Sequence, residues 1–246
     1  MFLTLFMIVS CSSKKDILFV QDLKDSQTFS IDFNEYEIKV DDILKIDVFA
    51  ENSTLTLEFN RNNQNFNAQT KESMVLNGYQ VNPLGYINFP SVGKLKVEGL
   101  TVSQITKLIY ESIVNNGFLL NPTVDVKVIN SYFTILGEVN RPGRYDFIKN
   151  NMDIIQAIAM AGDLTINGQR KNIKIIRNYG DKKSVSTIDL TKSDFFTSKN
   201  FQIFSGDIII VDPNSTRVKN AGIIGNSGTL LSLLSFLLSS FIVMNN

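Results

Sequence analysis

The sequence predicts an α+β fold in which two small domains are followed by a C-terminal transmembrane helix. Two features carry this prediction. Between residues 36 and 213, short segments that alternate apolar and polar residues, as half-buried strands do, are interrupted by helical patterns. After residue 220 a long uncharged stretch follows, as in helices that cross a bilayer. Strands in this order around single helices favour a sheet that wraps a helix.

The chain opens with a short apolar segment that ends just before its one cysteine. Residues 2–9 carry no charge, Ser10 is small, and polar residues follow Cys11. This order resembles the lipobox of bacterial lipoproteins, in which the cysteine becomes the lipidated N-terminus of the mature chain. We therefore expect residues 1–10 to be a lipoprotein signal peptide and the polar residues 11–35 to be a lipidated tether. The alternative is a buried thiol in an N-terminal helix.

The first predicted domain covers residues 36–130. Apolar residues at every second position predict strands, Pro and Gly predict a turn, and apolar residues three or four apart behind a threonine cap predict a helix. The expected elements, in order, are strands at 36–40 and 43–49, a turn at 82–85, a helix at 102–113 capped by Thr101, and a strand at 124–128.

The second predicted domain covers residues 131–213 and is richer in strands. A Pro-Gly turn separates its first two segments, and a glycine ends its one short helix. The expected elements are a strand at 133–139, a turn at 140–145, a helix at 153–161 ended by Gly162, a hairpin of 173–177 with 184–189, and a buried strand within 204–211.

Residues 214–246 form the predicted membrane segment. The stretch 221–244 has no charged residue, and as a helix it would extend ~36 Å, more than the ~30 Å of a hydrocarbon core. One face of this helix carries small residues, which suit close packing of membrane helices or contact with a water-filled lumen. These residues are Gly228, Ser232, Ser235 and Ser239. The outer and the inner membrane both stay open as its location, and a core helix of a soluble domain is the alternative.

Composition excludes several classes of function. The 24 Lys and Arg residues balance the 24 Asp and Glu residues, so no excess of positive charge favours nucleic acid as a partner. The chain has no His and a single Cys, which removes the common zinc and copper ligands, His-dependent catalytic triads and disulfides. No pair of carboxylates has a catalytic spacing. We therefore expect no metal, no cofactor, no catalytic residue and no enzymatic activity.

Several strings in both domains carry a family resemblance. Residues 85–93 (GYINFPSVG) and 97–101 (VEGLT) resemble the polysaccharide export domain of Wza-type outer-membrane proteins. The strings at 136–145 (LGEVNRPGRY), 161–163 (AGD) and 205–211 (SGDIIIV) resemble the SLBB β-grasp domain of the same proteins. The chain departs from the family in having Val40-Asp41-Asp42 where a Pro-Gly-Asp turn is usual, and in having room for one SLBB unit only.

The resemblance implies a function and partners. It implies export of a capsular polysaccharide or exopolysaccharide through a homo-oligomeric ring, whose terminal helices form a barrel across the outer membrane of a Gram-negative bacterium. It also implies that most of the chain lies in the periplasm, anchored by membrane lipid, and that the ring meets an inner-membrane polysaccharide copolymerase. Two other functions stay open: a lipid-anchored periplasmic protein that binds a glycan or small ligand without forming a pore, and a structural protein of the cell envelope.

Two cations mark a candidate contact between subunits. Arg141 and Arg144 flank the rigid Pro-Gly turn of the second domain. We expect them to pack against a neighbouring subunit, where carboxylates such as Glu138 or Asp163 are suitable partners. A solvated hairpin tip is the alternative.

Overall fold

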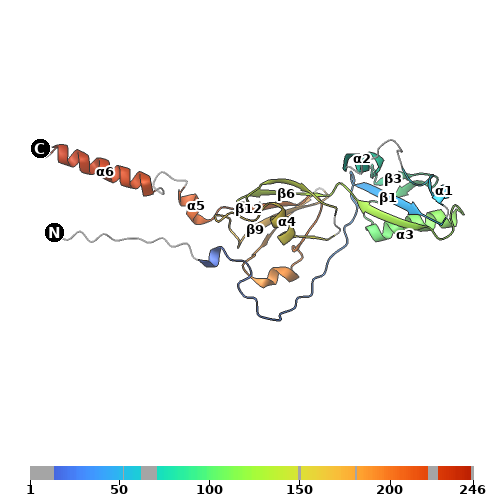
Figure 1. Cartoon of the computed structure of the whole chain (residues 1–246), viewed down its shortest axis with the longest axis horizontal. Helices are drawn as coiled ribbons and strands as arrows, with labels where there is room; N and C mark the ends of the chain where they lie inside the picture. The colour runs from blue at the N-terminus through green and yellow to red at the C-terminus, as the bar shows by residue number, and fades with distance from the viewer. Residues whose placement is uncertain are drawn as a thin grey trace.

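Two separate hydrophobic cores divide the chain in the computed structural model. The structure describes residues 14–51, 53–61, 71–148, 151–180, 182–220 and 227–244. One core gathers side chains between Ile38 and Val128, and the other gathers side chains between Phe133 and Val211. The two domains lie one after the other along the long axis of the molecule (Figure 1). The predicted α+β class is confirmed.

The first domain is built on a small antiparallel sheet. Its central strand β1 (Ile43–Phe49) pairs with β2 (Tyr79–Gln80) on one side and β5 (Thr123–Val128) on the other. A separate hairpin joins β3 (Tyr86–Phe89) to β4 (Gly93–Lys96). The described residues of this domain also form the helices α1 (Ser53–Thr56), α2 (Lys71–Asn77) and α3 (Val102–Asn115).

Helix α3 forms as its sequence predicts. The Thr101 hydroxyl accepts a hydrogen bond from the Gln104 amide, and the Gln104 side chain accepts one from the Thr101 amide, which is a complete capping box. Ile105, Ile109 and Ile113 are fully buried and form the stripe that packs into the core.

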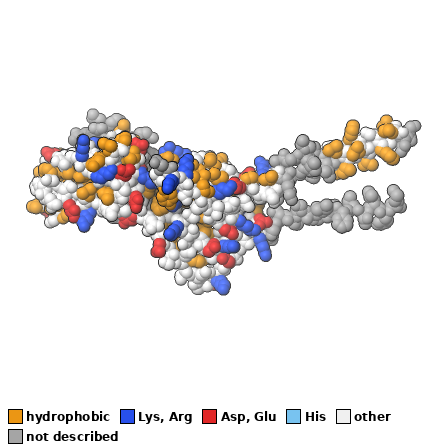
Figure 2. Space-filling view, turned by 180° about the vertical axis from the view of Figure 1, so that it is seen from behind, with side chains coloured by type: hydrophobic (Ala, Val, Ile, Leu, Met, Phe, Trp, Pro, Cys, Tyr) orange, Lys and Arg blue, Asp and Glu red, His pale blue; other side chains and the backbone are white. Residues whose placement is uncertain are grey.

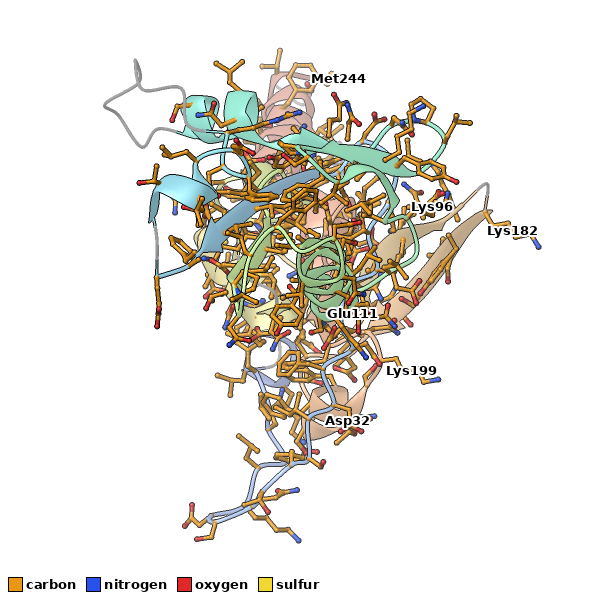
Figure 3. The ribbon with its side chains drawn as sticks, turned by 90° about the vertical axis from the view of Figure 1, so that its right-hand side faces the viewer. Asp32, Lys96, Glu111, Lys182, Lys199 and Met244 are labelled. Carbon is orange, nitrogen blue, oxygen red and sulfur yellow. The ribbon has the colours of Figure 1, made fainter. Side chains whose placement is uncertain are left out.

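Among the described residues, the second domain contains a five-stranded mixed sheet in the order β10-β9-β12-β6-β7. Its strands are β6 (Tyr132–Gly137), β7 (Gly143–Asp146), β9 (Ile173–Tyr179), β10 (Lys182–Ile188) and β12 (Ile208–Val211). Helix α4 (Ile154–Met160) contributes buried side chains to the same core as the sheet. Strand β8 (Met152–Asp153) pairs with β11 (Gln202–Ile203), and η2 (Ser193–Thr197) lies between β10 and β11 in the chain. The β9–β10 hairpin projects from the domain, with Lys182 pointing outward near its tip (Figure 3).

One backbone position shows why the second domain needs glycine. Strands β6 and β12 run parallel, and β6 ends at Gly137, whose φ is +91°. A Cβ at this position would overlap the carbonyl oxygen of Val211 on β12. Only glycine, which has no Cβ, allows the two backbones to approach so closely at a residue with positive φ.

The predicted strand at 36–40 is wrong. This segment makes only an isolated bridge, between Glu37 and Thr101. The Ile38 amide donates to the Leu100 carbonyl at 2.9 Å, so the segment pairs with the loop before α3 and not with β1. Ile38 is still buried, which accounts for the alternation that suggested a strand.

The described part of the predicted tether packs along the second domain. We call residues 14–35 the N-terminal strap; it begins with the 3₁₀ helix η1 (Lys14–Asp16). The Val20 amide donates to the Leu190 carbonyl at 3.0 Å, and the amide and carbonyl of Asn34 bond the buried Gln202 side chain, both at 2.8 Å. Figure 1 shows the strap, in dark blue, passing beside the second domain before the chain enters the first.

The C-terminal segment requires a correction. It forms α5 (Ser215–Asn220) and α6 (Ser227–Met244), and none of the helices in the described residues has both the length and the apolar character needed to cross a membrane. Helix α6 has 18 residues, against the 24 of the predicted span, and serines interrupt its apolar residues. The predicted transmembrane helix is therefore not found. Hydrophobic side chains nevertheless cover much of α6 (Figure 2).

Candidate functional site

Arg141 makes contacts within its own domain. Its backbone amide donates to the Ala161 carbonyl at 2.9 Å, and its Nη2 donates to the Met160 carbonyl at 3.4 Å. These bonds satisfy carbonyl groups at the C-terminal end of α4, where a cation is electrostatically favoured. Arg141 therefore fastens the Pro-Gly turn to the helix.

Arg144 lies on β7 and remains more exposed. Its guanidinium lies over the ring of Tyr132 at 3.7 Å from the centroid, and its Nε is 3.4 Å from Asp146 Oδ1. Its side chain is 58% exposed. Of the carboxylates expected to pair across subunits, Glu138 lies 3.6 Å from Arg217 in its own chain. The two predicted cations are thus neighbours in the fold but have different local roles.

Serine hydroxyls on α6 bond back to the backbone of their own helix. Ser235 Oγ donates to the Ser232 carbonyl at 2.9 Å, and Ser239 Oγ donates to the Ser235 carbonyl at 2.7 Å. Gly228 lies one turn earlier on the same helix. Hydroxyls that bond back to the helix need no other partner, so these serines are compatible with apolar surroundings. The other candidate, Cys11, lies outside the described residues.

A cavity of about 220 Å³ lies between the two domains. Its walls come from the end of the strap, the start of α3, the linker after β5 and the loop after β11. Aromatic side chains form part of the wall: Tyr36 and Phe204 stack with centroids 6.3 Å apart, and Phe147 lies beside them. Polar lining residues are Glu35, Ser103, Ser131, Asn151 and Ser205.

The charge of the cavity comes from Glu35. Its Oε1 accepts a hydrogen bond from Ser103 Oγ at 2.9 Å. Hydrogen bonds from Thr101 and Ser103 hold the pKa of Glu35 below its usual value, so this carboxylate is ionised at neutral pH. Glu35 is the one charged residue among the described residues that line the cavity, which gives the cavity a negative character.

Hydrogen bonds behind the cavity fix its aromatic wall. The Tyr36 hydroxyl donates to Asp42 Oδ2 at 2.9 Å; burial and this neighbouring carboxylate raise the pKa of Tyr36, so its hydroxyl stays protonated. On the other side, the Phe204 amide donates to Asp207 Oδ2 at 2.8 Å, and the Arg177 guanidinium lies 4.3 Å from the centre of the Phe204 ring. Both rings are therefore held in place before any ligand arrives.

Sequence reasoning missed this cavity. Its residues come from segments more than 150 positions apart, and no local motif links the strap to the loop after β11. The 205–211 string resembles the SLBB family, but nothing in it predicts that Asp207 is buried against Arg177. Alternation in β9 predicted a buried face, yet it gave no sign that a buried position holds an arginine.

Both domains match known families. Residues 32–129 match the family model described as polysaccharide biosynthesis/export protein, and residues 132–187 match the SLBB domain. The EPS I polysaccharide export outer membrane protein EpsA of Ralstonia solanacearum is 27% identical over 140 residues, which cover 55% of this chain and 36% of that protein. The protein of the same name from Ralstonia nicotianae is 27% identical over 141 residues, covering 56% of this chain and 36% of the relative.

The matches agree with the fold. The matched region spans about a third of these relatives, and the two family models together cover well over half of this chain in the order in which its two cores occur. The family is one of export proteins and is not a known enzyme family. The chain therefore belongs to the Wza-type family of polysaccharide export proteins, with an export domain followed by an SLBB domain.

Proposed function

We propose that this protein is a subunit of an outer-membrane assembly that exports a capsular polysaccharide or exopolysaccharide. The observation that carries the proposal is the export domain and SLBB domain in tandem, each with its own core. The relatives from Ralstonia are named as outer-membrane polysaccharide export proteins, which supports both the substrate class and the membrane. The activity is transport, without a chemical step.

The proposal includes lipid anchoring through Cys11. The apolar segment before this cysteine supports it. The position of the strap also supports it, because η1 and α5 lie at the same end of the molecule, while the export domain lies at the opposite end (Figure 1). With lipid at Cys11, the SLBB domain would face the membrane and the export domain would extend into the periplasm.

The proposal also includes a ring of identical subunits that meets an inner-membrane polysaccharide copolymerase. The exposed Arg144 is the side chain we assign to a contact between subunits, with Arg141 supporting its turn from inside. A membrane-crossing barrel of terminal helices is not part of the proposal, because no described helix is suited to cross a membrane. Arg141→Ala combined with Arg144→Ala should reduce the size of oligomers purified in detergent, whereas Lys182→Ala, on the β9–β10 hairpin, should not.

Export is tested in the native host by deleting the gene and measuring polysaccharide on the cell surface and in the periplasm. We expect surface polysaccharide to disappear and to return with the full chain. Cys11→Ser should restore it poorly, and mass spectrometry of the wild-type chain should find a diacylglyceryl cysteine at its N-terminus. Undiminished surface polysaccharide in the deletion strain would refute the proposed function.

A second candidate function is a lipid-anchored protein that binds a glycan without forming a pore. The cavity between the domains favours it, since small-molecule sites often lie at domain interfaces. Electron microscopy of purified particles separates the two functions. A ring with a central hole supports export through the assembly, and particles that remain single subunits support the binding protein.

A further inference from the structure

The cavity between the two domains has a combination of groups that suits a sugar ring. Tyr36 and Phe204 present half-buried aromatic surface, against which the C–H groups on one face of a pyranose can pack. Hydroxyl and carboxylate groups line the rest of the space. Sites that combine an apolar wall with a few convergent polar groups are typical of small-molecule binding.

The polar groups have capacity left for a ligand. Ser131 is 7% exposed and lines the cavity, and its hydroxyl makes no side-chain hydrogen bond to another of the described residues. Glu35 accepts bonds from Thr101 and Ser103, but a carboxylate has about four acceptor positions in total. Sugar hydroxyls are donors as well as acceptors, so they can bond both groups. Bonds to the ionised carboxylate would be the stronger ones.

Size and charge narrow the class of ligand. A volume of about 220 Å³ is below the ~300–1,000 Å³ of pockets that hold drug-sized ligands, so it suits one ring and not an oligosaccharide. The ionised Glu35 repels another carboxylate in the same cavity, which disfavours acidic sugars. Neutral sugars meet no such repulsion.

We propose that the cavity between the export domain and the SLBB domain binds one neutral pyranose ring, with Glu35 and Ser131 bonding its hydroxyls and Tyr36 and Phe204 packing against its face. The site deepens the proposed function, on which the choice of a sugar as ligand rests. Because the walls come from both domains, a bound ring would also hold the domains in one relative orientation.

The test is binding of glucose, N-acetylglucosamine and glucuronate to the full chain in detergent, measured by saturation-transfer difference NMR. Glu35→Gln keeps the shape of the side chain and removes its charge, and should weaken binding of the neutral sugars by about tenfold. Ser103→Trp places a large ring in the lining of the cavity, from an exposed position, and should abolish binding. Glu111→Gln is the matched control: this side chain is 52% exposed on α3 and contacts only Lys107 among the ion pairs of the described chain (Figure 3).

The inference holds if the wild type and Glu111→Gln bind neutral sugars more tightly than glucuronate while both cavity variants lose affinity with unchanged unfolding midpoints. It is overturned if no sugar gives a signal with the wild type, if all variants bind equally, or if glucuronate binds best. The deletion strain keeps the two proposals apart. If no sugar binds the full chain and the deletion strain loses export, the sugar site alone is rejected. If the deletion strain exports normally, the proposed function is rejected.

Discussion

The buried ion pair of the SLBB domain offers a sharp test of how this domain is held together. Arg177 on β9 donates from Nε to Asp207 Oδ1 at 2.9 Å and from Nη2 to Asp207 Oδ2 at 2.7 Å. Its Nη2 also donates to the Gln202 carbonyl at 2.7 Å. Burial alone would lower the pKa of Arg177, but hydrogen bonds and the charge of Asp207 outweigh burial and raise it. The perturbation we choose is Asp207→Asn, which removes the charge and keeps the size.

The expected loss of stability is large because both partners are shielded from water. The side chains are 10% exposed for Arg177 and 0% exposed for Asp207. Removing one partner of a buried pair leaves an uncompensated charge and costs about 3–5 kcal/mol. For a domain of this size each kcal/mol lowers the melting temperature by about 4 °C or more. The transition of the SLBB domain should therefore fall by at least about 12 °C.

Scanning calorimetry of the full chain measures this change, and hydrogen exchange of β9 and β12 identifies the transition. The matched control is Asp146→Asn in the same domain, which breaks the exposed pair with Arg144. Exposed pairs contribute less than about 1 kcal/mol, so the control should change the melting temperature by only a few degrees. If Asp207→Asn lowers the melting temperature of the SLBB domain no more than the control does, our view that the buried pair stabilises the domain is refuted.

Three further predictions concern other parts of the chain. Tyr79→Phe should cost about 1 kcal/mol near pH 7 by removing a buried hydrogen bond. Burial raises the pKa of Tyr79 to about 12, above the ordinary value of about 10 that applies in the unfolded chain, so the wild type should lose about 2 kcal/mol of stability as the pH rises from 10 to 12. Because Tyr79→Phe does not share this loss, urea unfolding near pH 7 and at pH 12 should show that the order of stability of the two proteins reverses. An unchanged order would contradict the assignment. Gly137→Ala should lower the free energy of unfolding by about 3 kcal/mol or more, because the new Cβ would overlap the Val211 carbonyl. Gly180→Ala, whose Cβ would meet no other atom, should lower it by about 1 kcal/mol. Equal losses of stability in thermal unfolding would disprove the steric argument. Truncation after Asn220 removes the exposed apolar surface of α6 and should reduce the association of subunits in detergent-free gel filtration, with both domain transitions intact. Undiminished association would show that α6 does not contribute to it.

The sequence alone determined much of the secondary structure. Alternation predicted β1, β5 and the β9–β10 hairpin, and the apolar stripe behind Thr101 predicted α3. These signals work because a strand or helix records its buried face in residues only two to four positions apart. The strings shared with the export family also identified both domains correctly.

Two local predictions failed for physical reasons that local patterns do not contain. Residues 36–40 alternate as a strand does, but a strand also needs a partner of matching length, and only Glu37 bridges to Thr101. The uncharged stretch after residue 220 suggested a membrane helix, but how far α6 extends is settled by the backbone and not by composition.

The candidate sugar site was decided by the tertiary structure alone. Asn34 and Gln202 are 168 positions apart in sequence, yet their two hydrogen bonds fix the strap to the SLBB domain, so that Glu35 and Ser131 line the same cavity. The sequence around Asn34 gives no sign that its partner is Gln202, and the reverse is also true. Such a hydrogen bond depends on where two separately folded segments meet. The sequence therefore determined the two domains and their family, while the packing of the strap against both domains decided which side chains share the cavity between them.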